Sequence, residues 1–348
     1  MFVSLSLRSL INVEALNSVE TVGNLSRHRS APIIIPQPNG YTVKYVPAIS
    51  GESIAHGYQA ELVEVAKSLD LPVGLYSSRY EFIKFSEDDY LKDEGIDPPK
   101  DHNDLRRFEV DVLLKDVVAD VGGFLYAGDI PVKRTSRIQV GYMIPALQDL
   151  QDATAVEAQF HVRYLFSKPQ KGGGKKAEEK GKEEGAKLGQ AIYHVEVASA
   201  LYTLNINLDL AGIGVPSIGF GKPGKGETEL AKQAPKRRRA ALITLAKLLS
   251  NTSFGGRHSR FLPNSELRSS VIALADSAFI VSPGNYTDYV QRTWTRAEKY
   301  SGLTGHAVRL WCVNREGLSV PDEISKHDTI EGVFEELMRQ VKEARIID

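Results

Sequence analysis

The chain of 348 residues has very little cysteine and no long apolar run. Its one cysteine, Cys312, excludes an intramolecular disulfide and a cysteine-rich zinc site, and we expect it to lie in a strand as a small hydrophobe. No apolar stretch approaches the ~20 residues that a membrane-spanning helix needs. The alternating, charged start of the chain is unlike a signal peptide. We therefore expect a cytoplasmic protein that does not bind membranes.

The chain also lacks an excess of charge of either sign. It carries 43 Lys and Arg against 44 Asp and Glu, a formal net charge of −1. This balance excludes a uniformly basic nucleic-acid binder, but it allows a local basic patch. A hydrophobic content of 42% with 25% charged residues is typical of a globular protein with a core, and the length allows one elaborated domain or two.

A basic patch is present between Lys232 and Arg260, where eight Lys and Arg occur without any Asp or Glu. The apolar spacing predicts a helix from Pro235 to Leu249, with the proline in its first turn. A Gly255-Gly256 loop follows, and glycine lets the backbone of a polyanion come close to the protein backbone. The alternative is a solvated helix face followed by an ordinary turn. The candidate contacts in this loop are Arg257, His258 and Arg260.

Hydrophobic periodicity predicts the core elements, because alternating apolar residues indicate strands and apolar residues three and four apart indicate helices. The expected core consists of strands at 2–13, 156–166, 190–210 and 267–276 and helices at 51–69 and 235–249. Ser50 is the expected N-cap of the first helix. A C-terminal extension at 280–348 should end in a helix at 329–345. This order matches the ferredoxin-like βαββαβ pattern of RNA-recognition modules, so the expected fold is α+β with an RRM-like palm in a single elaborated domain.

Three segments interrupt that pattern. Asn17 to Gly40 contains Pro32, Pro36 and Pro38 and is expected to be a long loop, in which the run Arg27-His28-Arg29 favours contact with an anion. Residues 70–150 lack a clean period and are interpreted as a finger-like insertion that includes the basic segment Lys133 to Arg137. Pro169 to Gly189 holds six Lys, four Glu and six Gly, a composition that cannot bury enough apolar surface to offset the entropy of ordering. We expect a flexible loop at 167–189.

Two motif matches fail at their remaining positions. Gly219 to Gly226 fits G-x-G-x-x-G, and it also fits a phosphate-binding loop except at its last position, where Gly226 replaces the required Ser or Thr. His194-Val195-Glu196 fits the opening of the zinc-deaminase signature, whose two cysteines a chain with one cysteine cannot supply. We therefore expect neither a nucleotide cofactor nor a catalytic metal.

The expected sheet also lacks the aromatic signature of modules that stack bases on their strands. RNA contacts should therefore come mainly from loops and helix ends, through the phosphates. His161, flanked by Gln159 and Arg163, is either a polar-face contact, a general base or a structural histidine.

Several long segments, in order, resemble a known family: NVEALNSVETVGNLSRHRSAP, YVPAISGESIAHGYQAELV, YEFIKFS, DVGGFLYAGDIPVKRTSRIQVGYMIPAL, EAQFHVR, VEVASALYT and FGGRHSRFLP. From Asn12 to Pro263 the chain resembles the backbone subunits of archaeal type I-A CRISPR surveillance complexes (Cascade), the DevR-like branch of the RAMP superfamily. The resemblance implies a modified RRM-like palm with inserted finger and thumb elements. It also implies several copies along one CRISPR RNA, held by its phosphates, with no nuclease activity.

The partners that the resemblance implies are a CRISPR guide RNA, target DNA through that guide, copies of the same chain head to tail, and other type I-A Cascade subunits. The Gly-rich loop Phe254 to Arg260 resembles a hallmark of the RAMP superfamily, and the loop at Asn24 to Ser30 and the segment Lys133 to Arg137 resemble family stretches on the RNA-facing side. The candidate RNA-binding residues are Asn24, Arg27, His28, Arg29, Ser50, His56, Lys133, Arg134, Ser136, Arg137, His161, Arg163, Arg257, His258 and Arg260.

Two other functions stay open at this point. Some RAMP relatives cleave repeat RNA near a Gly-rich loop with histidine as general base, so a metal-independent endoribonuclease using His28, His161 or His258 is the alternative. A transcriptional regulator would need a helix-turn-helix, and no segment has the composition of a recognition helix.

Overall fold

The computed structural model describes residues 1–149, 154–166, 188–221 and 223–348, so the expected loop at 167–189 lies outside the described residues except at its end. The strands are β1 (Phe2–Glu14), β2 (Ser18–Val22), β3 (Leu25–His28), β4 (Ser30–Gln37), β5 (Gly40–Pro47), β6 (Phe124–Tyr126), β7 (Val132–Arg134), β8 (Ile138–Val140), β9 (Ile144–Pro145), β10 (Thr154–Phe166), β11 (Leu188–Asp209), β12 (Asn264–Ala275), β13 (Val308–Asn314) and β14 (Ser325–His327). The α-helices are α1 (Gly51–Ser68), α2 (Asp88–Glu94), α3 (Leu105–Lys115), α4 (Val117–Gly122), α5 (Glu227–Asn251), α6 (Tyr289–Thr304) and α7 (Ile330–Glu343).

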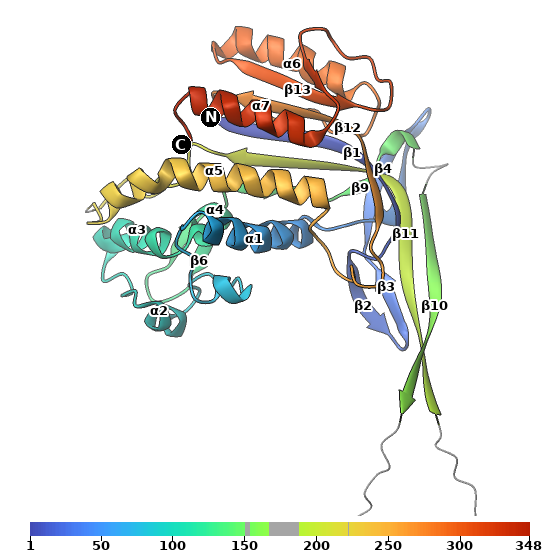
Figure 1. Ribbon diagram of the computed structural model, residues 1–348, viewed down its shortest axis with the longest axis horizontal. Helices are drawn as coiled ribbons and strands as arrows, with labels where there is room; N and C mark the ends of the chain where they lie inside the picture. Colours follow the sequence, from blue (N-terminus) through green and yellow to red (C-terminus); the bar gives the residue numbers. More distant parts are fainter. Residues whose placement is uncertain (150–153, 167–187, 222) are drawn as a thin grey trace, which may run out of the picture.

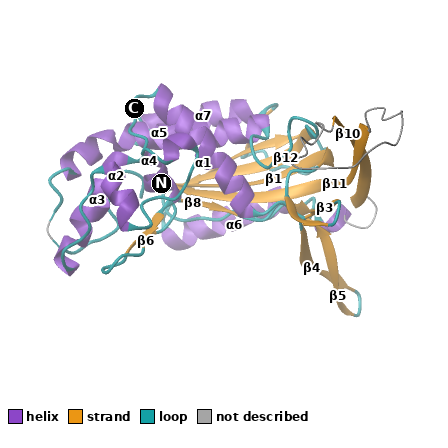
Figure 2. Cartoon of the chain, turned by 90° about the horizontal axis from the view of Figure 1, so that it is seen from below, coloured by secondary structure: helices purple, strands orange, loops and turns teal. Residues whose placement is uncertain are grey.

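A mixed sheet in the order β14-β13-β12-β1-β11-β3-β2 forms the centre of the molecule, and the fold is α+β as expected. Helices α1, α5 and α7 cover one face, and α6 covers the other face beside β12 and β13 (Figure 1 and Figure 2). The alternation in β1 explains this arrangement, because Val3, Leu5 and Leu7 pack into the core on the α1 side. On the opposite face, Ser4 and Ser6 accept hydrogen bonds from the backbone of the segment that leads to α6.

The long β10–β11 ribbon leaves the central sheet as an arm (Figure 1). β1 pairs with β11 between Asp209 and Ala198, whereas β10 pairs with β11 between Ala200 and Leu188, so the two pairings hardly overlap. The short strands β8 and β9 lie beside the other half of β11. The sequence predicted both strands of the arm but not this division of β11 between sheet and arm.

The prediction of one long loop from Asn17 to Gly40 is wrong. β2 and β3 form a hairpin that extends the sheet beside β11, and β4 and β5 form a separate hairpin. Pro32 and Pro36, which suggested a loop, lie within β4. A two-stranded hairpin consists of edge strands only, and edge strands tolerate proline because its missing N–H need not face a partner.

Other predicted elements are confirmed with shifted bounds. The helix expected at 51–69 is α1, and Ser50 Oγ accepts a hydrogen bond from Ser53 N as its N-cap. Cys312 is buried in β13. The helix expected from Pro235 begins earlier, at Glu227, with Pro235 in its interior. The buried residues Leu230 and Ala234 anchor the additional turns, and their packing offsets the backbone hydrogen bond that the proline removes.

Among the described residues, no helix combines the length and the apolar character needed to span a membrane.

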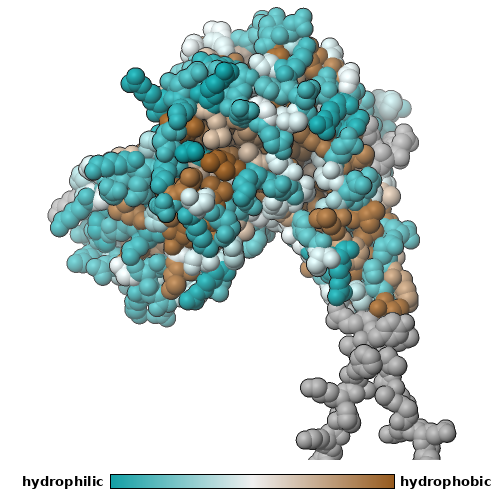
Figure 3. Space-filling model, viewed as in Figure 1, coloured by the Kyte–Doolittle hydropathy of each residue, from teal (hydrophilic) through white to brown (hydrophobic). Residues whose placement is uncertain are grey.

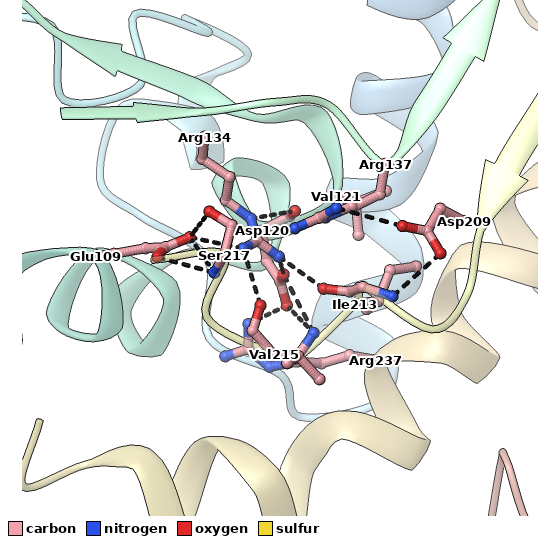
Figure 4. Close-up of polar contacts among 12 residues, drawn as sticks. Glu109, Asp120, Val121, Arg134, Arg137, Asp209, Ile213, Val215, Ser217 and Arg237 are labelled. Atoms are coloured by element: carbon pink, nitrogen blue, oxygen red, sulfur yellow. Dashed lines mark hydrogen bonds and ion pairs between the residues drawn. The ribbon is translucent and has the colours of Figure 1, made fainter. Parts of the chain in front are cut away.

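A buried ionic cluster attaches the helices α3 and α4 to α5 (Figure 4). Arg134 Nη2 lies 2.5 Å from Asp120 Oδ1, and Arg134 Nη1 lies 2.8 Å from Glu109 Oε1. Arg237 Nη1 lies 3.0 Å from Asp120 Oδ2, and the side chains of all four residues are fully buried. Backbone N–H groups of Gly214, Ser217 and Ile218 donate to the two carboxylates. Arg134 was expected to contact RNA, and Arg237 belongs to the basic patch, but both lie inside the protein because acids distant in sequence neutralise them.

Candidate nucleic-acid interface

The Gly-rich loop after α5 is fixed against the end of β1. Gly255 has a φ of +82°, and a side chain there would place Cβ 2.8 Å from the carbonyl oxygen of Leu16. The next residue, Gly256, donates its N–H to that same oxygen at 2.8 Å. We expected the glycines to allow a ligand to come close to the backbone, but the backbone of Leu16 occupies that position. The contact with Leu16 holds the exposed residues Arg257 and Arg260 at a defined place on the surface.

Asn17 connects two other predicted segments to the same place. Its backbone oxygen accepts a hydrogen bond from Arg29 N, and its side-chain Oδ1 accepts one from Ser50 N, both at 2.8 Å. Arg27 to Arg29, Ser50 and the Gly-rich loop thus converge on the pair Leu16-Asn17. The sequence prediction missed Asn17, although it lies in the first segment that carried the family resemblance.

Aromatic side chains lie beside Arg260. The ring of His161 stacks on Tyr193 at 5.2 Å between centroids and meets the edge of Phe261 at 5.2 Å. Arg260 Nη1 donates to Tyr193 Oη at 3.1 Å. Asn24 O accepts a hydrogen bond from His194 N, which joins the β2–β3 turn to the arm. The sequence prediction missed Tyr193 and Phe261, although each has a histidine or arginine directly beside it in the chain.

We call the surface formed by these residues the junction surface, because it lies where the arm leaves the central sheet. Its members are Asn24, Arg29, His161, Tyr193, Arg257, Arg260 and Phe261. Arg27 follows Leu25 by two residues in β3, and Leu25 pairs with His194, so Arg27 projects from the opposite face to Tyr193. It contacts Glu20 there at 3.6 Å, and because both side chains are more than half exposed this pair contributes little. Arg29 Nε is buried without a hydrogen-bond partner in the described part of the chain. Sites that bind single-stranded nucleic acid have two components: cations that can bind phosphates, and aromatic rings on which bases can stack. The junction surface contains both.

The remaining candidate RNA-binding residues lie elsewhere on the molecule, or their side chains contact other residues of the protein. Lys133, Ser136 and Arg137 lie on the side of β7 and α4, at the opposite end of the molecule from the arm (Figure 1), and Arg137 pairs with Asp209 at 3.2 Å. His56 packs against Phe82, and His258 Nε2 bonds to Phe254 O. The side chain of Arg163 lies outside the described residues. Lys133 to Arg137 therefore lie apart from the two segments with which they were expected to share RNA binding.

His28 is buried beneath the junction surface. Its Nε2 lies 2.7 Å from Glu14 Oε1, its Nδ1 lies 2.7 Å from Arg29 O, and Tyr202 Oη donates to the same Glu14 oxygen. Burial, the largest single influence, would lower the pKa of His28. The hydrogen bond and the charge of Glu14, the carbonyl of Arg29 and the charge of Glu196 together outweigh burial, and they raise this pKa above its ordinary value of 6.5. We expected His28 to contact RNA, but its side chain is buried and its Nδ1 instead bonds to the backbone oxygen of Arg29.

The raised pKa of His28 predicts a pH-dependent stability. The folded protein binds this proton more tightly than the unfolded chain, so its stabilisation is complete below pH 6.5 and is lost as the pH rises through the folded pKa. Each unit by which the folded pKa exceeds the unfolded one adds about 1.4 kcal/mol. Urea unfolding of the wild type and of His28→Gln, from about pH 5 to about pH 8, should show the largest difference at the acidic end. A difference that grows with pH would show that His28 acts as the neutral imidazole.

Comparisons with known proteins identify relatives along most of the chain. Residues 5–294 match the family described as "CRISPR-associated negative auto-regulator DevR/Csa2". The chain is 49% identical over 336 residues to the "CRISPR-associated aCascade subunit Cas7/Csa2 2" of Saccharolobus solfataricus, covering 96% of this chain and 99% of the relative. It is 34% identical to the "CRISPR-associated protein Cas7/Csa2 1" of the same organism, covering 91% and 94%. A solved chain from a "CRISPR RNA-guided surveillance complex, pre-nicking" shares the fold with a TM-score of 0.55 at 12% identity, covering 98% of this chain and all of that one.

Proposed function

Because the chain belongs to the DevR/Csa2 family of CRISPR-associated proteins, we propose that it binds a CRISPR RNA and forms the non-catalytic backbone of a surveillance complex. The observation that supports this proposal most is the junction surface, in which Arg260 lies beside stacked aromatic rings and Arg29, from a distant segment, converges on the same place through Asn17. Phosphate contacts fix the position of an RNA without reading its sequence, and aromatic stacking is tolerant of sequence. A guide holder needs that combination, because its RNA varies in sequence and the base edges must stay free to pair with target DNA.

In this proposal β12, β1 and β11 with α1 and α5 are the RRM-like palm of a single elaborated domain. Residues 70–150 are the finger-like insertion, residues 280–348 are the C-terminal extension, and the β10–β11 arm is the thumb. The ionic cluster of Arg134 and Arg237 then holds the finger to the palm.

Other subunits of the complex and further copies of this chain are the proposed protein partners, and target DNA is a partner through the guide. Copies that line up along one RNA contact each other through two different surfaces, a heterologous arrangement that can extend without closing. The net charge of −1 suits such an array, because strongly basic copies would repel each other before RNA neutralised them.

Salt titration of RNA binding tests the proposal. Three junction-surface cations, Arg29, Arg257 and Arg260, predict that log K falls with log salt with a slope of about −2, at about 0.7 for each single-strand phosphate. Affinity should hardly change when the spacer sequence is scrambled, because phosphates carry no sequence information. Binding that is independent of salt, or confined to one sequence, would contradict the proposal.

The alternative, a metal-independent endoribonuclease, finds no support in the geometry of His28. Both ring nitrogens of His28 lie within hydrogen-bond distance of protein acceptors, and its side chain is buried. A general base must instead reach the proton that it removes. Incubation of the protein with repeat RNA in EDTA decides between the two: cleavage that His161→Ala or His258→Ala abolishes would establish the enzyme.

A further inference from the structure

A groove runs along α6, on the face of the sheet opposite to α1, α5 and α7 (Figure 2). It consists of two hollows of about 500 and 440 Å³ between the helix and residues 276–288, the segment that connects β12 to α6. Thr295 and Arg296 line both hollows, so the two lie side by side. The lining residues of this α6 groove lie between 278 and 300, outside the segments that form the junction surface.

The segment that forms the second wall of the groove is fixed in place. Gly284 donates its N–H to Ser6 Oγ at 2.9 Å and accepts a hydrogen bond from Arg8 Nη1 at 2.8 Å, and both partners belong to β1. Ser282 N donates to Thr293 Oγ1 in α6 at 3.0 Å. These hydrogen bonds join the segment to the sheet and to the helix. A preformed groove binds a partner at a lower entropic cost than one that must first be ordered.

The charge that lines the groove is mainly positive. Its charged residues are three cations and one acid, namely Arg292, Arg296, Lys299 and Asp288. The guanidinium carbon of Arg292 lies 5.4 Å from the centre of the Tyr286 ring, and that of Arg296 lies 5.4 Å from the centre of the Phe279 ring. Stacking on a ring holds a guanidinium in one orientation, which suits the bidentate binding of a carboxylate.

The protein itself neutralises little of this positive charge. Arg292 Nε lies 2.7 Å from Asp288 Oδ2, but both side chains are more than half exposed, so a carboxylate from outside can compete for the arginine. Arg296 Nη1 donates to Ser282 Oγ at 3.2 Å, and this hydroxyl carries no charge. Lys299 is exposed. Because the whole chain has a net charge of −1, the groove is a local concentration of cations that favours an acidic partner.

Other features of the groove distinguish a peptide from a nucleic acid. Ile280 is 48% exposed in the hollow that Lys299 also lines, where an apolar side chain of a partner can cover it. Phe279 is buried beneath Arg296, so its ring is not accessible for stacking by a base. The carboxylate of Asp288 repels phosphates but accepts hydrogen bonds, and a peptide backbone brings N–H donors whereas a phosphodiester backbone brings none. These features favour a peptide with acidic and apolar side chains.

We propose that the α6 groove binds an extended peptide segment of a partner protein in which acidic residues alternate with apolar ones. Arg292 and Arg296 are separated by about 6 Å along the helix axis. In an extended chain the residues on one side recur at every second position, about 6.6 Å apart. Acids at alternate positions therefore meet the two arginines in turn, and the apolar residues, which point to the opposite side, meet Ile280. This inference goes beyond the proposed function, because the contact requires no RNA.

Fluorescence anisotropy of a labelled eight-residue peptide, in which glutamate alternates with leucine, tests the groove on the intact protein. Arg292→Ala with Arg296→Ala should weaken binding of this peptide by about 10-fold, because both lost contacts are charge-assisted. Arg239→Ala with Arg339→Ala is the matched control and should bind the peptide like the wild type. These two arginines belong to α5 and α7, which lie on the largely hydrophilic face of the molecule in Figure 3. None of the four arginines is buried, so neither variant should change the melting temperature.

Three further probes decide the chemistry of the partner. The same peptide with glutamine in place of glutamate should bind the wild type at least about 10-fold more weakly, because the charge of each contact is lost. A version with serine in place of leucine should also bind more weakly, because Ile280 loses its apolar contact. An oligothymidine of about eight nucleotides should bind the wild type and the variant at Arg292 and Arg296 equally. Equal binding of the glutamate and glutamine peptides, loss of oligothymidine binding in this variant, or no binding of the glutamate peptide at about 1 mM would each overturn the inference.

Discussion

Replacing Asp120 with alanine is expected to reduce the free energy of unfolding by about 3–5 kcal/mol. The carboxylate of Asp120 pairs with Arg134 through Oδ1 and with Arg237 through Oδ2, and it accepts the N–H of Gly214. Alanine would leave two guanidinium groups buried with one carboxylate, that of Glu109, to compensate them. Arg237 would suffer most, since its other side-chain partner is the neutral amide of Gln233.

Urea unfolding followed by circular dichroism measures this effect, with Asp89→Ala as the matched control. Asp89 pairs with Lys92 one helical turn away, and both side chains are almost fully exposed. Loss of such a surface pair should change stability by less than about 0.5 kcal/mol. Equal stabilities of the two variants would contradict the assignment of the cluster as the attachment of α3 and α4 to α5. Because these helices carry the proposed finger, Asp120→Ala should also loosen residues 70–150 before the central sheet unfolds.

Local periodicity was enough to predict β1, β10, β11 and β12 and the helices α1 and α7, because their apolar residues recur at the spacing of a strand or of a helix. It failed for β4, where proline was interpreted as a breaker although edge strands accept it. It also failed for the start of α5, since the packing of Leu230 and Ala234 outweighs the local preference of Pro235 for a first turn. The first failure depends on the position of a strand in its sheet and the second on tertiary packing, and no local pattern shows either of them.

The site was predictable in part. The basic segments at Arg29 and Arg257 do converge on the pair Leu16-Asn17, but which arginines face inward depends on acids elsewhere in the chain. One signal could have identified Arg237: it lies in the helical stripe of Leu230, Ala234, Ala241 and Leu245, all of which are buried. A cation inside an apolar stripe predicts a buried ion pair, because an unpaired buried charge is too costly. For Arg134 and His28 the neighbouring sequence contains no comparable signal.

Reversing the charge of Arg257 and Arg260 is the change with the largest expected effect on RNA binding. At about 0.1 M salt each phosphate contact contributes roughly a factor of five relative to 1 M, so two lost contacts cost about 25-fold and the added repulsion brings the loss to about 100-fold. The fold should tolerate Arg257→Glu with Arg260→Glu, because both residues are exposed and the partner to which Arg260 donates, Tyr193 Oη, is neutral. Lys299→Glu with Lys342→Glu, on α6 and α7, changes the net charge equally and is the matched control.

The salt dependence shows why affinity is lost. If Arg257 and Arg260 bind phosphates, the slope of log K against log salt should become less negative by about 1.4 in the double variant and stay unchanged in the Lys299 and Lys342 control. If the substitutions merely disordered the loop that Gly255 holds against Leu16, the melting temperature would fall together with the affinity, and Arg257→Gln with Arg260→Gln would leave binding intact. A double variant that binds RNA like the wild type would mean that the loop is structural, and the junction surface would then depend on Arg29 alone.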